Sequence, residues 1–245
     1  MTADRILLEV CVDTPAGLAA AIAGGADRIE LCAALALQGL TPAPGLMAQA
    51  AKAPIPIYPM IRPRNGDFCY DAGDLDHMRR DIDAVREYGL AGVVIGANLP
   101  DGQLDLDALE MLVEHSQGLG LSLHRAFDLV PEQSVALEAA IALGFERVLT
   151  SGGALTAQAG AERIAELVRQ ADGRIGILAG AGVRPSNVAE LVRRTGVREV
   201  HGSFGGQIPG AAPGSRLSEM GFVPPELRET DEAAVAEAAR ILRDL

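Results

Sequence analysis

The sequence predicts a single (β/α)8 barrel that takes up the whole chain, residues 1–245, and three observations support this prediction. Eight short runs rich in Ile, Val and Leu recur along the chain, and successive runs begin 22 to 35 residues apart. Ala- and Leu-rich stretches with charges on one face separate these runs, as expected for amphipathic helices. A chain of 245 residues is a usual length for this fold. Strands and helices that alternate in this way indicate a parallel sheet closed into a barrel.

The predicted strands follow from the apolar runs and cover residues 6–12, 28–32, 57–61, 92–95, 121–124, 147–150, 174–179 and 199–201. Helices are expected over residues 74–88, 105–117, 132–143 and 162–170, with a closing helix over 231–243. A weak repeat supports this order, because a glycine ends the preceding helix shortly before the strand at Gly25, Gly89, Gly144 and Gly196. Residues 202–225 are rich in Gly, Pro and Ser, and they are expected to form a long loop.

Composition excludes several classes of partner. The chain has 33 acidic and 21 basic residues, a net charge of −12, which disfavours a nucleic-acid partner. No apolar run approaches the roughly 18–20 residues needed to span a bilayer, so no membrane partner is expected.

The three cysteines form no CxxC pair and cannot make a disulfide framework, which favours the reducing cytoplasm. The only lysine, Lys52, is expected at the bottom of the barrel, so any catalysis is expected to avoid a lysine imine.

Polar side chains are predicted to point into the mouth of the barrel, where active sites of this fold lie. Strand residues two apart share a face, which places Glu9, Cys11, Glu30 and Cys32 inside. The same phase places Met60, Arg62, Ser122, His124, His201 and Ser203 inside. We expect one pocket to gather Glu9, Glu30, Arg62, His124 and His201. Arg62 is expected to neutralise a carboxylate, because an unpaired buried charge is costly. The alternative is a salt-bridged polar layer of the core.

The loops after the strands add candidate anion-binding groups. Residues 62–70 offer Arg62 and Arg64 to a carboxylate or phosphate, although Asp67 could instead brace an arginine. Glycine-rich turns follow the sixth and seventh strands and contain Ser151 and the pair Gly180 and Gly182. Backbone amides in such turns often bind phosphate, but the same turns also occur without a ligand.

If the protein is an enzyme, we expect acid–base or electrostatic catalysis on a small anionic or phosphorylated molecule. Glu9 or Glu30 would be the base and His124 the acid, with Asp128 close in sequence. The candidate substrate-binding residues are Arg62, Arg64, Asp67, Arg125, Ser151, Gly180, Gly182, His201 and Ser203. No organic cofactor is implied.

Taken together, these segments resemble the CutC family, proteins associated with copper homeostasis. The matching motifs lie at residues 9–13, 24–32, 39–42, 61–70, 124–128, 144–152 and 179–184, and the resemblance spans residues 6 to about 203. It implies a cytoplasmic (β/α)8 barrel linked to copper handling and often assembled as a homo-oligomer, for which we favour a dimer. Cys11 and Cys32 match the family cysteines proposed to hold Cu(I).

The chain departs from the family pattern at Asn65, where glycine is usual, and at residues 36–38, where Glu-Gly-Gly is common. Soft thiolates suit Cu(I), and neighbouring strands would bring Cys11 and Cys32 together. Buried cysteines are also common without any metal. Three interpretations therefore stay open: a copper-binding protein, a barrel enzyme of unassigned reaction, and a non-catalytic oligomeric scaffold.

Overall fold

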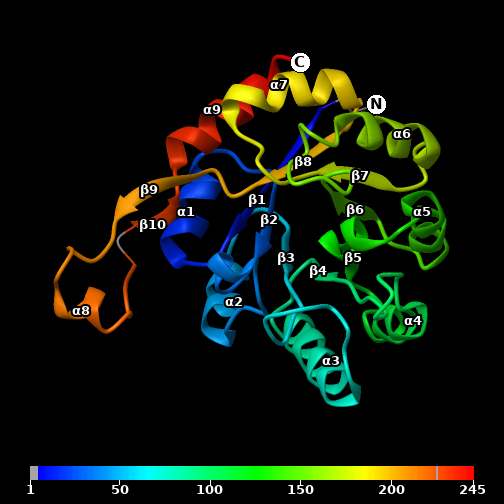
Figure 1. Cartoon of the computed structure of the whole chain (residues 1–245), viewed down its shortest axis with the longest axis horizontal. Coiled ribbons are helices and arrows are strands. Elements are labelled where there is room, and N and C mark those ends of the chain that lie inside the picture. Colours follow the sequence, from blue (N-terminus) through cyan, green and yellow to red (C-terminus); the bar gives the residue numbers. More distant parts are fainter. Residues whose placement is uncertain (1–4, 225) are drawn as a thin grey trace.

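The structure, a computed structural model, describes residues 5–224 and 226–245, and its centre is a barrel of eight parallel strands (Figure 1). The strands are β1 (Leu7–Val12), β2 (Arg28–Leu31), β3 (Ile57–Pro59), β4 (Gly92–Ile95), β5 (Gly120–Leu123), β6 (Arg147–Thr150), β7 (Gly176–Ala179) and β8 (Glu199–Gly202). Their order in the sheet is β3-β2-β1-β8-β7-β6-β5-β4. The sheet closes between β3 and β4, where Ile61 N donates to Val94 O at 2.9 Å. The predicted (β/α)8 barrel is thus confirmed.

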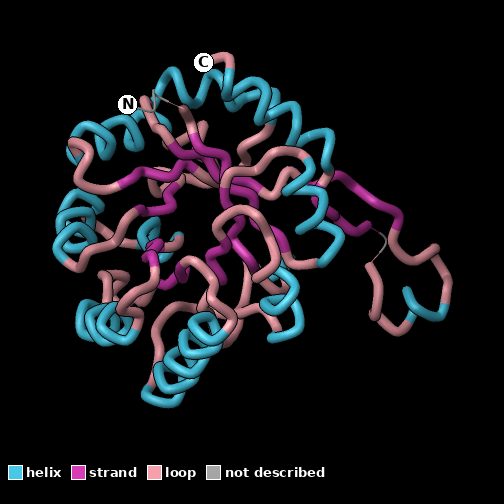
Figure 2. The backbone as a smooth tube through the Cα atoms, turned by 180° about the vertical axis from the view of Figure 1, so that it is seen from behind, coloured by secondary structure: helices cyan, strands magenta, loops and turns pink. Residues whose placement is uncertain are grey.

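Helices form a ring outside the strands, as the view from behind shows (Figure 2). They are α1 (Pro15–Ala23), α2 (Pro44–Ala50), α3 (Ala72–Glu87), α4 (Leu106–His115), α5 (Gln133–Ala142), α6 (Ala161–Ala171), α7 (Pro185–Thr195) and α9 (Glu232–Arg243). Side chains of Thr14, Asp71, Asp105 and Asp231 accept hydrogen bonds from the first amides of their helices. Such caps satisfy donors that have no partner within the helix. None of the helices in the described part of the chain is long and apolar enough to cross a membrane.

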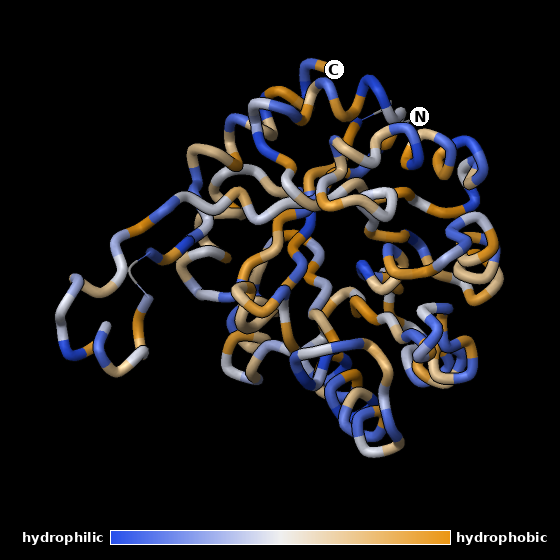
Figure 3. Tube along the Cα trace, in the orientation of Figure 1, coloured by the Kyte–Doolittle hydropathy of each residue, from blue (hydrophilic) through white to orange (hydrophobic). Residues whose placement is uncertain are grey.

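The main core lies between the strands and the surrounding helices, and hydrophobic segments accordingly line the inside of the helical ring (Figure 3). A smaller apolar cluster, formed by Cys32, Tyr58, Met60 and Val94, fills part of the barrel interior. Tyr58 also explains two glycines of the strands. A Cβ on Gly92 would lie 2.2 Å from the Tyr58 ring, and a Cβ on Gly120 would lie 2.2 Å from the Tyr58 hydroxyl. The barrel is therefore packed with side chains near its base.

The segment after β8 differs from the long loop expected over residues 202–225. Two antiparallel strands, β9 (Gly205–Pro209) and β10 (Glu226–Thr230), form an arm that carries a short helix, α8 (Arg216–Glu219). The arm projects from the barrel on the side of α1 (Figure 1). Its base is fixed to the barrel by Thr14, whose hydroxyl donates to Glu229 Oε1 at 2.6 Å.

Candidate functional site

Three neighbouring strands bring acidic, sulfur and imidazole groups together inside the barrel. In the sheet, β1 lies between β2 and β8, with Cys11 opposite Glu30 and Glu9 opposite His201. Glu9, Cys11, Glu30 and His201 are all buried, as the alternation of the strands predicts. Cys32 follows directly after β2 and is completely buried. We call Cys11, Glu30 and His201, with Cys32 beside them, the metal-candidate cluster.

The geometry of the metal-candidate cluster is compact. Possible ligand atoms of Cys11, Glu30 and His201 all lie within 4.8 Å of one another. His201 Nε2 is 3.7 Å from Glu30 Oε2, and the Cys32 thiol donates to the same oxygen at 3.6 Å. On its other side, His201 Nδ1 is 2.7 Å from Glu9 Oε1. The imidazole is thus fixed by one carboxylate and presents its second nitrogen to Glu30.

Charge in this part of the barrel is unevenly distributed. Burial alone would raise the pKa of Glu9, but Arg28 and His201 outweigh burial and hold the pKa at about 2. Burial raises the pKa of Glu30, and the nearby Glu9 charge adds to this effect. The pKa of His201 is raised although burial opposes it, because Cys11 and Glu30 favour the imidazolium. Burial also raises the pKa values of the Cys11 and Cys32 thiols.

Arg28, and not Arg62, neutralises the buried carboxylate, so that expectation was wrong. Arg28 Nε forms an ion pair with Glu9, and its Nη2 pairs with Glu199 at the start of β8. Sequence reasoning missed Arg28 although it has the same phase as Glu30 on β2 and must also point inward. The signal was present, but the first residue of a predicted strand is easily assigned to the preceding turn.

Arg62 instead joins two loops at the mouth, the loop after β2 and its own loop after β3. Its Nη1 donates to the carbonyls of Leu37 and Gly39 at 2.9 and 3.0 Å, and its Nη2 donates to Gly66 O at 2.7 Å. The guanidinium lies over the Phe68 ring at 4.9 Å. On the other side of the mouth, the His124 ring lies 4.6 Å from the same Phe68 ring. Arg62, Phe68 and His124 therefore form a second group.

His124 is held as a neutral imidazole. Burial, with the charge of Arg62 added, lowers the pKa of His124 to about 3. Its Nδ1 accepts a hydrogen bond from Ala126 N at 3.1 Å. This arrangement favours a hydrogen-bond donor at Nε2 over the proton-donating acid expected from the sequence. The five residues expected in one pocket form two groups, and no hydrogen bond or ion pair within the described residues joins them.

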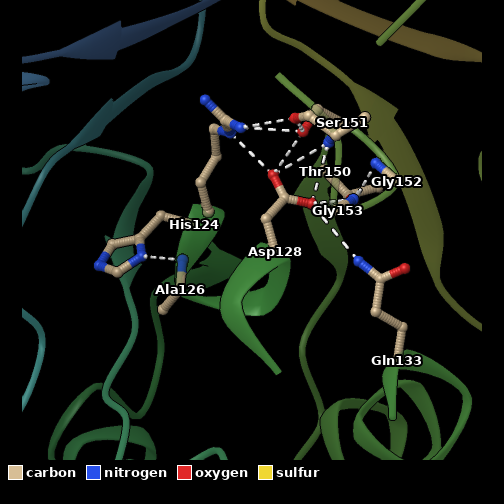
Figure 4. A network of polar contacts seen from close by, with 10 residues as sticks. His124, Ala126, Asp128, Gln133, Thr150, Ser151, Gly152 and Gly153 are labelled. Carbon is tan, nitrogen blue, oxygen red and sulfur yellow. Dashed lines mark hydrogen bonds and ion pairs between the residues drawn. The ribbon is translucent and has the colours of Figure 1, made fainter. Parts of the chain in front are cut away.

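Asp128 organises a separate network with Arg125 and Ser151 (Figure 4). Its carboxylate accepts hydrogen bonds from Thr150 Oγ1 at 2.5 Å, Arg125 Nε at 2.7 Å and Gly153 N at 3.0 Å. The Ser151 amide and hydroxyl also donate to it. The His124 ring points away from this network (Figure 4). With its oxygens occupied in this way, Asp128 braces the turn after β6.

The remaining candidates lie at the rim of the mouth. Arg64 donates to Asp74 and Asp67 and to the carbonyl of Cys69, so the Asp67 brace is present. Gly180 lies against the site, since a Cβ there would be 3.3 Å from His201 and 2.5 Å from Leu149. Gly182 has φ +75° at the following turn. Ser203 is exposed, because β8 ends at Gly202, so the expectation that it points into the barrel was wrong. Lys52 follows α2 and precedes β3, at the opposite end of the barrel.

Comparison with known proteins places this architecture in a family. The family model for CutC matches residues 6–206. A CutC family protein of Caulobacter vibrioides is 74% identical over all 245 residues and over its own full length. A CutC family protein of Sinorhizobium medicae is 56% identical over 232 residues, 95% of this chain and 94% of that protein. The solved structure of CutC from Streptococcus agalactiae is 33% identical, covers 81% of this chain and 98% of its own, and has a TM-score of 0.78. The chain belongs to the CutC family.

Proposed function

We propose that this protein binds Cu(I) through Cys11 and His201, with Glu30 and Cys32 adjoining, and that it serves copper homeostasis. One observation carries the proposal: Glu9 holds His201 Nδ1 at 2.7 Å, while Nε2 lies 3.7 Å from Glu30 in a cluster that also contains Cys11. Histidines that bind metals regularly bond a carboxylate through their other ring nitrogen, which fixes the tautomer and the orientation of the ring. If the pair of Glu9 and His201 served stability alone, it would not require the thiols of Cys11 and Cys32 beside it.

The chemistry of the donors also fits Cu(I). Thiolates and imidazole are the ligands that soft copper prefers, whereas a carboxylate alone would favour harder cations. Glu30 Oε2 lies between the Cys32 thiol and His201 Nε2, so the four side chains share one small volume. Metal binding requires the thiolate form of each cysteine that coordinates the ion, and it therefore releases protons.

The comparisons support the biological part of the proposal. The Streptococcus agalactiae relative bears the name "Putative Copper Homeostasis Protein CutC". We further propose that the protein works in the cytoplasm, where thiols stay reduced, because all three of its cysteines are free thiols.

An anaerobic Cu(I) titration against a competing chelator tests the metal site. We expect the Cys11→Ser/Cys32→Ser variant to bind Cu(I) at least about tenfold more weakly than wild type, because both soft donors are lost. Cys69→Ser is the matched control, since this cysteine lies on the loop after β3 and outside the cluster. Equal affinities of wild type and the double variant would exclude the site.

A second candidate function is acid–base chemistry on a small anionic molecule. The observation that favours it is a buried Glu30 with a raised pKa in a barrel mouth that also holds Arg62 and His124. Incubation of a small-molecule cell extract with wild type or Glu30→Gln, followed by mass spectrometry, tests this candidate. Depletion of a carboxylated or phosphorylated compound by wild type alone is the expected result, and identical profiles would contradict it.

We also propose that the protein forms a homodimer through its arm. Several large apolar side chains of the arm are exposed, namely Ile208, Leu217, Met220, Phe222 and Leu227. A two-stranded hairpin that projects from its domain is only marginally stable alone, so a second subunit would stabilise it. Apolar surface of this kind is typical of protein interfaces.

A further inference from the structure

Arg62 is a buried cation for which no acidic partner exists among residues 5–224 and 226–245. Its relative exposure is 4%, and the three hydrogen bonds of its side chain all go to backbone carbonyls, those of Leu37, Gly39 and Gly66. The other buried arginines of the described chain, Arg28 and Arg147, each have two carboxylate partners. A buried charge that no opposite charge neutralises is strongly unfavourable, so the contrast between Arg62 and these two arginines requires an explanation.

The second observation concerns two nitrogen atoms that have no hydrogen-bond partner in the described part of the chain. One is Arg62 Nε and the other is His124 Nε2, and both are completely shielded from solvent. Because His124 Nδ1 accepts from Ala126 N, the proton of the neutral ring resides on Nε2. Burial and Arg62 keep the pKa of His124 near 3, so the ring is neutral at physiological pH. Both unpartnered atoms are therefore N–H donors.

The side chains that carry the two donors contact the same aromatic ring. Phe68 contacts the Arg62 guanidinium at 4.9 Å and the His124 ring at 4.6 Å. His124 is seated firmly, because a Cβ on Gly96 at the end of β4 would lie 2.4 Å from its Cε1. Phe68 is only half-buried and belongs to the loop after β3. It is thus the most solvent-exposed member of the group.

We propose that Arg62 Nε–H and His124 Nε2–H bind the carboxylate of a small molecule, which reaches them when Phe68 moves aside. Two donors match the two oxygens of a carboxylate, and its charge neutralises Arg62. Three of the five guanidinium N–H groups already donate to carbonyls, and Nε–H is the buried donor that has no partner. This site extends the second candidate function and is independent of the metal-candidate cluster.

Histidine-selective ¹⁵N NMR of the full-length protein tests the site, with acetate and malonate as probes and inorganic phosphate at matched ionic strength as comparison. We expect the carboxylates to move the His124 Nε2 resonance in a saturable way. The affinity is expected to fall at least about tenfold in His124→Phe, which removes the donor and keeps a ring on Gly96. His77→Gln, on the exposed surface of α3, should bind as wild type does.

The outcomes separate this site from the functions proposed above. Saturable carboxylate binding that persists in Cys11→Ser/Cys32→Ser supports a site distinct from the metal-candidate cluster, whether or not the protein proves to be an enzyme. If neither carboxylate moves the His124 resonance of wild type, or phosphate alone does, the proposal is overturned. Unchanged carboxylate affinity in a folded His124→Phe variant would also overturn it. The wild-type titration decides the matter if that variant does not fold.

Discussion

At the scale of single residues, two buried arginines, Arg28 on β2 and Arg62 just beyond β3, behave differently. Arg28 forms ion pairs with both Glu9 and Glu199, which makes it part of the structure of the barrel. Arg62 bonds only to carbonyls and keeps its charge available at the mouth. The contrast shows that the role of a buried charged side chain depends on the groups to which it bonds. The alternation of residues along a strand predicts that a side chain points into the barrel, but it does not predict which groups that side chain contacts.

The first prediction concerns the stability that Arg28 provides. Arg28→Met should lower the free energy of unfolding by about 3–5 kcal/mol, because the buried Glu9 loses its guanidinium partner and keeps only His201. Urea denaturation at pH 7 measures the loss. In the control, Arg174→Met breaks a pair with Glu138 on the exposed surface, and solvent screening should make its effect far smaller. Similar losses in the two variants would show that the Glu9–Arg28 pair is not coupled to folding.

The second prediction concerns pH. The pKa of His124 is about 3 in the folded protein and near 6.5 in the unfolded chain, so acid favours the unfolded state. Stability from this residue is complete above pH 6.5 and is lost as the pH falls toward 3. Between pH 7 and 5 wild type should lose about 2 kcal/mol more than His124→Gln. Denaturation curves at both pH values test this, with His77→Gln as control. Parallel pH dependence of wild type and His124→Gln would contradict the buried neutral ring.

At the scale of elements, the sequence predicts the barrel strands well because apolar runs and glycine ends recur. The residues at 92–95 and 147–150 match β4 and β6, and the closing helix is α9. Period-two alternation also identifies Glu9, Cys11, Glu30 and His201 as inward. It does not identify the carbonyl partners of Arg62, since these come from loops whose course no local pattern specifies. The strands β9 and β10 were missed because they pair across a long connection and because β9 contains Gly and Pro.

The third prediction tests how β4 positions the mouth. Gly96→Ala should destabilise the protein by about 1–3 kcal/mol, because a methyl group there overlaps the His124 ring. Thermal denaturation and the His124 NMR signals report the effect. Gly45→Ala in α2 is the control, since nothing lies within 4 Å of its Cβ and alanine favours a helix. An unperturbed His124 signal in Gly96→Ala would mean that the ring is not seated on this glycine.

At the scale of the whole molecule, the protein combines a closed barrel with a projecting arm. The family-model match ends at residue 206, just inside β9, whereas the Caulobacter vibrioides relative aligns over the full length. The arm contacts its own barrel mainly at its base, through β10 and α1. Its apolar side chains are therefore left for another surface, which is the reason for proposing a dimer.

The fourth prediction is that the arm controls assembly. Phe222 is 70% exposed on the arm, and Phe222→Ser should shift the protein toward monomer in sedimentation velocity experiments. Leu155→Ser is the matched control, because Leu155 is 94% exposed on the loop after β6 and lies outside the arm. A wild-type protein that sediments as a monomer, or a Phe222→Ser variant that stays a dimer, would contradict the role of the arm.

Copper K-edge X-ray absorption on the Cu(I)-loaded protein tests the central claim, the metal-candidate cluster, most directly. We expect sulfur and imidazole nitrogen in the first coordination shell of copper, since Cys11 and His201 are the soft donors brought together by β1 and β8. The sulfur contribution should fall in Cys11→Ser and persist in Cys69→Ser. A shell without sulfur, or one that loses its sulfur only in Cys69→Ser, would contradict the assignment.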